Sequence, residues 1–178
     1  INGGKSEFLD IIPSTIHLAM IAETANQKIF REKIIKRLIE RVNKTYDYVI
    51  LDCQPTLGIL AINAIYASDV IIIPTNFGKY SLDGISDLLQ SIESIKIDHK
   101  YKYYILRNMY ERRNSQTNKF INQRLNDTVG NYLLDTVIRK NEAINQAQIN
   151  EVPVKLFNPS SNGAHDFQQL VTELLGYV

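Results

Sequence analysis

Short β-branched runs alternate along the chain with stretches in which apolar residues recur at helical spacing. The runs predict strands over residues 8–12, 46–52, 70–74, 101–106 and 132–138. The helical spacings predict helices over residues 27–42, 60–67, 82–97, 115–125, 142–148 and 163–176. Strand–helix alternation with short connections is typical of a doubly wound, mostly parallel sheet. The pattern therefore predicts an α/β fold, with residues 1–178 forming a single domain.

The segment 46–74 carries the most informative pattern in the chain. Residues 49–51 form an apolar run that ends on Asp52, and a stretch with Pro55 and Gly58 follows. A carboxylate at the carboxyl end of a buried parallel strand lies where open α/β sheets bind ligands, and it suits a magnesium–phosphate site. Aspartate also ends strands and begins helices for backbone reasons alone, so a plain cap is the alternative.

Composition indicates a globular protein and adds one asymmetry of charge. The single cysteine, Cys53, excludes a disulfide framework, and the sequence has no run of about 18 apolar residues that would cross a membrane. The net charge is +1, but residues 96–140 hold ten basic and four acidic side chains, which leaves +6. Such an excess favours binding to a phosphate backbone, and a solvated basic face is the alternative.

Five segments, in order along nearly the whole chain, carry motifs of a known kind. They are FLDIIPSTIHLA from Phe8, the stretch from Tyr46 to Pro74, YSLDG from Tyr80, NMYERR from Asn108 and FNPSSNGA from Phe157. Together they resemble the ParA/Soj partition ATPases, relatives of MinD. The second segment is similar to that family's Walker B and switch II region, although Gln54 replaces a proline and Thr56 a serine.

The resemblance implies a P-loop NTPase fold, a three-layer α/β/α arrangement, that hydrolyses ATP with Mg²⁺. Asp52 would be the catalytic Walker B carboxylate, which orients the water shell of the Mg²⁺ ion and so contacts the metal indirectly. Gln54, Pro55 and Gly58 would form switch II, which couples the γ-phosphate to dimerisation and DNA affinity. Asn108 matches a position beside the adenine, and a turn residue at a strand end is its alternative role.

The resemblance also implies an ATP-dependent homodimer that binds DNA without sequence preference. Two positions that contact DNA in the family correspond to Arg113 and Lys140, and Arg139 stands where the family has a proline. Lysine attracts phosphate as a point charge but lacks the planar fork of arginine. The implied partners are nucleoid DNA and a centromere-binding ParB-like protein. The implied location is cytoplasmic, on the nucleoid and not on a membrane.

The family's phosphate-binding P-loop has no counterpart in this sequence. Gly3-Gly4-Lys5-Ser6 mimics the end of such a loop, but no strand precedes it, and Asn2-Gly3-Gly4 favours a turn. We therefore expect an N-terminally incomplete form of the family, its C-terminal two-thirds, that does not hydrolyse ATP by itself. We also expect an isolated monomer to be unstable, because residues 49–51 would lack a neighbouring strand.

Two other functions stay open at this point. The first is a catalytically inactive module that binds only DNA or a partner, which a test of nucleotide binding would distinguish from an ATPase. The second, less favoured, is a MinD-like membrane-associated ATPase; such proteins end in a basic amphipathic helix, whereas residues 156–178 contain no lysine or arginine. Asn63, on a short apolar helix, is open between a switch or interface hydrogen bond and plain helix capping.

Overall fold

A computed structural model describes residues 9–42, 45–76, 80–97 and 100–177 of the chain. Contacts within the chain divide it into two compact units. Among the described residues, the first unit consists of residues 72–76, 80–88 and 102–177, and the second of residues 9–42, 45–71, 89–97 and 100–101. The assignment of one domain to the whole chain stays a prediction.

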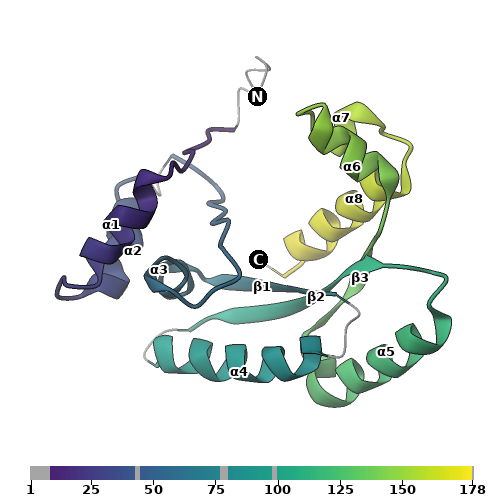
Figure 1. Cartoon of the computed structure of the whole chain (residues 1–178), viewed down its shortest axis with the longest axis horizontal. Coiled ribbons are helices and arrows are strands. Elements are labelled where there is room, and N and C mark those ends of the chain that lie inside the picture. The colour runs from purple at the N-terminus through teal and green to yellow at the C-terminus, as the bar shows by residue number, and fades with distance from the viewer. Residues whose placement is uncertain (1–8, 43–44, 77–79, 98–99, 178) are drawn as a thin grey trace. The chain divides into compact units, whose positions relative to one another are not determined.

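The secondary structure over the described residues is shown in Figure 1. The α-helices are α1 (His17–Ala25), α2 (Ile34–Ile39), α3 (Ile59–Ala67), α4 (Tyr80–Ile95), α5 (Ser115–Val129), α6 (Glu142–Ile149), α7 (Val154–Phe157) and α8 (Asn162–Leu175). The strands are β1 (Val70–Thr75), β2 (Lys102–Tyr110) and β3 (Leu133–Arg139), and short 3-10 helices are η1 (Arg31–Lys33) and η2 (Gly130–Tyr132). From α3 onward every predicted strand and helix is confirmed, with ends shifted by up to four residues.

The first unit is built around a parallel sheet with helices on both faces. The sheet has the order β1-β2-β3, and β2 pairs with β3 in parallel. Helix α8 covers one face of β3 and α5 lies on the other (Figure 1). The core beneath α8 consists of Leu106, Leu134, Ile138 and Leu170, with Tyr104, Ile144 and Leu174 packed against it. This layering agrees with the predicted fold class.

Strand β2 is irregular near its carboxyl end. Two successive partner pairs lie three residues apart along β2 but only two residues apart along β3. Met109, in this stretch of β2, has a left-handed φ of 55°, and the side-chain oxygen of Asn108 accepts a hydrogen bond from Met109 N at 2.9 Å. A bulge of this kind bends a strand and redirects the residues beyond it. Here it leads residues 110–113 past the end of β3.

In the second unit, the buried Asn63 side chain joins α3 to the two helices before it. Asn63 is 3% exposed. Its amide nitrogen donates to Arg31 O at 2.7 Å and to Ile59 O at 2.9 Å, and its oxygen accepts from Ile35 N at 3.1 Å. These bonds satisfy partly buried backbone groups of η1 and α2. Asn63 therefore holds η1 and α2 onto α3, which neither of its two sequence-based roles describes.

Lys96, also in the second unit, closes the carboxyl end of α3. Its ammonium group donates to Tyr66 O at 3.1 Å and to Ser68 O. The last carbonyls of a helix lack partners within the helix, and a basic side chain is favourable beside them. Burial lowers the pKa of Lys96, while the charge of Asp69 opposes this change. The lysine is thus a structural part of the unit.

The two strands predicted nearest the N-terminus are not formed. Residues 9–12 and 46–52 have no strand pairing; residue 8 and the turn predicted over residues 2–4 lie outside the described residues. The β-branched run of the second segment favours a strand by propensity, yet Ile50 is 90% exposed. A strand forms only where a neighbour supplies hydrogen-bonding backbone groups, and none of the described residues does so here.

The helix predicted over residues 27–42 forms only in part. Phe30 has a left-handed φ of 56°, which interrupts any helix at that residue, and the chain then forms η1 and α2. Helix α1 and helix α7 were not predicted from the pattern. In the parts of the chain that the structure describes, no helix has the length and apolar character needed to cross a bilayer.

Candidate nucleic-acid interface

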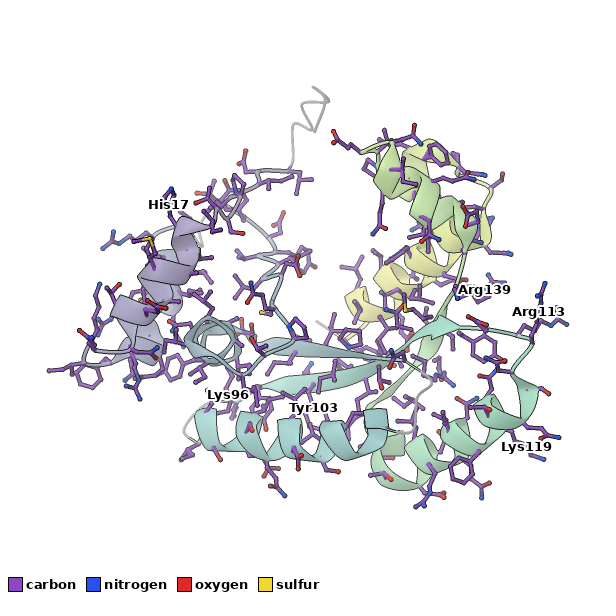
Figure 2. All side chains as sticks on the ribbon, in the orientation of Figure 1. His17, Lys96, Tyr103, Arg113, Lys119 and Arg139 are labelled. Atoms are coloured by element: carbon purple, nitrogen blue, oxygen red, sulfur yellow. The ribbon has the colours of Figure 1, made fainter. Side chains whose placement is uncertain are left out.

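A pocket rich in basic side chains opens beside the carboxyl ends of β2 and β3 in the first unit. Its volume is about 420 Å³, and its lining, here called the basic pocket, consists of Tyr110, Glu111, Arg112, Arg113, Arg139, Lys140, Asn141 and Asn162. Figure 2 shows Arg139 at the end of β3 and Arg113 between β2 and α5. The fold therefore brings together Arg113, Arg139 and Lys140, the residues predicted to bind DNA, from two separate segments.

The backbone of the two strands fixes where these segments meet. Tyr110 is the partner of Arg139 in the parallel ladder. One residue further, Lys140 N donates to Tyr110 O at 3.0 Å, so the pairing continues past the end of β3. The buried Asn118 of α5 donates from its amide nitrogen to Glu111 O at 2.8 Å. The carboxyl ends of β2 and β3 are therefore bonded to each other, and the segment after β2 is also bonded to α5.

Arg139 is bound to a buried carboxylate of α8. Its Nε and Nη2 both donate to Asp166, with 2.5 Å between Nη2 and Oδ1, and Arg139 N donates to Asp166 Oδ2 at 2.9 Å. The side chain of Asp166 is 2% exposed and that of Arg139 is 43% exposed. The hydrogen bond with Asp166 raises the pKa of Arg139. The charge of Arg139 is thus balanced inside the protein.

Lys140 is paired within the basic pocket itself. Its Nζ lies 2.6 Å from Glu111 Oε1, and the side chains are 60% and 40% exposed. The hydrogen bond from Lys140 and then its charge lower the pKa of Glu111, and the charge of Arg113 adds to this effect. The positive charges of Lys140 and Arg113 therefore both act on one carboxylate.

Arg112 and Arg113 complete the positive surface of the pocket. Their side chains are exposed, and within the described residues neither belongs to an ion pair. Four cations minus the Glu111 carboxylate leave +3 on the lining, and Asp166 beneath Arg139 reduces this to +2. The planar guanidinium groups match the geometry of phosphate oxygens. The pocket is therefore suited to an anion with several oxygens.

The residues predicted for nucleotide hydrolysis lie in the second unit. Asp52, Gln54 and Pro55 are exposed in a segment without strand pairing, and Gly58 immediately precedes α3. The described residues contain no group of three or more His, Cys, Asp or Glu side chains that could hold a metal ion. The sequence also lacks a phosphate-binding loop, so the residues present do not form a complete magnesium–nucleotide site.

Asn108 lies in the first unit, inside β2 and two residues before the pocket. It is half-buried, and its side-chain oxygen is occupied by Met109 N, the residue with the left-handed φ. The side chain therefore stabilises the bulge, in keeping with the turn role considered from the sequence. A contact between Asn108 and a nucleotide base stays a prediction.

Comparison with known proteins identifies the family of the chain. A sequence profile described as an AAA domain matches residues 1–105. The sporulation initiation inhibitor protein Soj of Bacillus subtilis is 35% identical over 172 residues, which cover 94% of this chain and 67% of Soj. The chain belongs to the ParA/Soj family of partition ATPases. The chromosome partitioning protein ParA of Caulobacter vibrioides is 27% identical over 172 residues, or 94% of this chain and 64% of that protein.

A solved structure shares the fold of this ParA/Soj chain. Cobyrinic acid a,c-diamide synthase from Mycobacterium smegmatis superposes with a TM-score of 0.75 and 22% identity over 92% of this chain and 60% of that one. The same enzyme with a bound ATP analogue and magnesium superposes with a TM-score of 0.59 and 24% identity over 65% of this chain and 48% of that one. At such identities the likeness concerns the fold, a three-layer α/β/α fold of the P-loop NTPase type.

Two carboxylates of the site were missed by sequence reasoning. Glu111 is part of a motif that the sequence points to, but its position opposite Lys140 depends on the ladder between β2 and β3. Asp166 carries a weak signal of its own, because it lies beside Gly163 and Leu170 on the buried side of α8. A carboxylate on a buried helix face needs a cationic or hydrogen-bonding partner. The sequence does not say that the partner is Arg139.

Proposed function

We propose that this chain serves a ParA-type partition ATPase that segregates a plasmid or chromosome, and that its basic pocket binds DNA without sequence preference. The observation that carries this proposal is the convergence of Arg112, Arg113 and Lys140 on one open pocket. Phosphate-backbone contacts made by such side chains give affinity but carry no sequence information. In the whole protein, DNA binding follows ATP-dependent homodimerisation and takes place on the nucleoid in the cytoplasm, with a ParB-like protein as partner.

The nucleotide-dependent part of this proposal concerns ATP and Mg²⁺ in the whole protein. It is supported by family membership and by the match of Asp52, Gln54, Pro55 and Gly58 to Walker B and switch II. A fold neighbour contains an ATP analogue and magnesium. Asp52 would contribute a carboxylate near the metal, and Asn108 would lie near the base. ATP would supply the γ-phosphoryl group that is transferred to water, whereas the residues of this chain would provide the DNA contacts.

A catalytically inactive, DNA-binding module is the second candidate. It is favoured by one observation, namely that Asp52 is exposed and lies in a segment without strand pairing among the described residues. Both candidates predict DNA binding by the basic pocket. They differ in nucleotide binding by the whole protein, which a titration with a fluorescent ATP analogue and Mg²⁺ measures.

Arg113→Glu is expected to weaken binding to unrelated DNA duplexes by the same factor, because the side chain contacts phosphate and no base. The slope of log affinity against log salt concentration should flatten by roughly one counterion or more. Fluorescence anisotropy with two labelled duplexes of different sequence measures both quantities. Arg124→Glu, an exposed arginine of α5 outside the basic pocket, is the control with the same charge change. Equal losses in the two variants, or loss with one duplex only, would contradict the proposal.

Asp52→Ala is expected to abolish ATP hydrolysis by the whole protein without unfolding it, because Asp52 matches the carboxylate that orients the metal's water shell. Phosphate release measured with ATP and Mg²⁺ tests this result. Asp47→Ala removes an exposed carboxylate from the same segment and should leave turnover unchanged. Normal turnover in a folded Asp52→Ala variant would remove Asp52 from the metal site.

A further inference from the structure

Glu111 is the one acidic residue among the eight that line the basic pocket. Its Oε1 accepts a hydrogen bond from Lys140 Nζ at 2.6 Å. Its pKa is lowered mainly by that hydrogen bond, and also by the charge of Arg113. The carboxylate therefore occupies a position that is favourable for an anion, in contact with Lys140 and under the influence of the charge of Arg113.

The pair is held in place by the backbone and not by the side chains alone. Lys140 N donates to Tyr110 O at 3.0 Å, and Asn118 fixes Glu111 O at 2.8 Å. The two residues therefore stay neighbours whether or not their side chains touch. Because the side chains of Lys140 and Glu111 are 60% and 40% exposed, water or an incoming anion can replace the carboxylate beside Lys140 at low energetic cost.

Arg139 is less available to an anion in the pocket than Lys140. The Nε and Nη2 edge of its guanidinium group already donates to Asp166, which is 2% exposed, so that edge is occupied by a carboxylate. The remaining cations are Arg112, Arg113 and Lys140, and Lys140 alone among these three is in an ion pair within the described residues. Neutralisation of Lys140 by Glu111 thus removes one of the three.

We propose that Glu111 is a built-in counter-ion that competes with a nucleic-acid phosphate for Lys140 and so keeps DNA binding weak and readily reversible. This inference rests on the proposed function and adds to it a residue that limits affinity. When a phosphate binds, the Lys140 ammonium moves from the carboxylate to the phosphate oxygens, and Glu111 is released to water. Because the Lys140–Glu111 ion pair is lost, the net free energy gained from the contact between Lys140 and the phosphate is smaller than it would be with an unpaired lysine.

Glu111→Gln should therefore bind DNA more tightly than the wild type, by about two- to fivefold, the range set by exposed ion pairs. It should also release roughly one more counterion, because Lys140 starts unpaired. Fluorescence anisotropy of the whole protein, with ATP and Mg²⁺ present, against two labelled duplexes of unrelated sequence measures both effects. The matched control is Glu142→Gln, which removes an exposed carboxylate two residues beyond Lys140 and outside the pocket lining. If the gain in DNA affinity came only from the loss of a negative charge, it would be equal in the two variants.

A double-mutant cycle separates competition for Lys140 from any other effect of Glu111. In a Lys140→Met background, Glu111→Gln should give no gain beyond that of Glu142→Gln. An equal gain in both backgrounds, or weaker binding by Glu111→Gln, overturns the inference while leaving the proposed DNA binding intact. Absence of binding by the wild type and by every variant overturns the proposed function and this inference with it. Circular dichroism of each variant verifies that the fold is kept.

Discussion

Arg139→Met is expected to lower the free energy of unfolding by about 2–4 kcal/mol, because it leaves the Asp166 carboxylate buried without its cation. The neighbouring Lys140→Met is expected to leave this free energy nearly unchanged. The two ion pairs have almost the same length, 2.5 Å and 2.6 Å, but the carboxylate side chains are 2% and 40% exposed. A buried carboxylate loses its hydration on folding, whereas an exposed one keeps it. The burial of the carboxylate, and not the length of the ion pair, therefore accounts for the difference between the two expected losses of stability.

Urea denaturation of both variants, followed by far-UV circular dichroism, measures this contrast. The double variant Arg139→Met with Asp166→Leu removes both charges, so it should recover part of the lost stability. Equal small losses in Arg139→Met and Lys140→Met would show that water reaches Asp166 and that the pair is not structural. Arg139 would then be available to DNA in the same way as Lys140.

The same contrast decides which residues are sound probes of DNA binding. A weakened complex in an Arg139 variant would mix two causes, loss of a possible phosphate contact and displacement of the strand end that carries Lys140. Arg113 and Lys140 have no comparable structural role, since their side chains are exposed. Arg139 stands where the family has a proline, and the structure gives it a definite task in holding β3 to α8. Its contact with DNA stays a prediction.

The part of the fold that the sequence predicted well is the part whose strands find partners within the chain. The β-branched run at residues 133–139 lies beside β2, and the ladder between them forms as the pattern predicts. The helices α5, α6 and α8 follow from helical spacing, and capping side chains define two of their beginnings. Asn141 accepts from Ala143 N, and Ser161 accepts from Ala164 N.

The predictions that were wrong depend on long-range partners that local patterns do not contain. Residues 46–52 have the composition of a strand, but composition does not provide a neighbour. The role of Asn63 is a second case, since its partners lie 28 and 32 residues before it in the chain. An amide on an apolar helix signals that some partner exists, but not which backbone groups it satisfies.

The sequence predicted the basic side chains of the candidate site but not the carboxylates that pair with them. Arg113 and Lys140 follow from family motifs, and the excess of basic residues between 96 and 140 agrees with them. That Glu111 pairs with Lys140, and Asp166 with Arg139, depends on the register of β2 against β3 and on the packing of α8. Charge counted along a sequence does not reveal which cations are already neutralised. The register and the packing of α8 do: two of the four cations of the pocket are paired, and Arg112 and Arg113 remain without an ion pair within the described residues.

The backbone amides of residues 48–57 are expected to exchange with solvent almost without protection. For the amides of Ile105, Leu106 and Ile138, the free energy of opening should approach the free energy of unfolding of their unit. The reason is that residues 48–57 donate no backbone hydrogen bond to another described residue, and that Ile50 is 90% exposed. Amides that open without breaking packed structure exchange at near-intrinsic rates, whereas core strands exchange only through larger unfolding. Hydrogen exchange followed by mass spectrometry of the isolated chain measures both regions in one experiment.

Protection at residues 48–57 comparable with that of β2 would contradict this result. It would mean that the β-branched run has found a strand neighbour, in a second copy of the chain or by rearranged pairing, and repetition at several protein concentrations distinguishes the two. Protection that rises with concentration indicates pairing between copies, because association follows mass action. A run with strong strand propensity and unpaired backbone is prone to such pairing. The expected lack of protection in dilute solution and the tendency to associate when concentrated have the same physical origin.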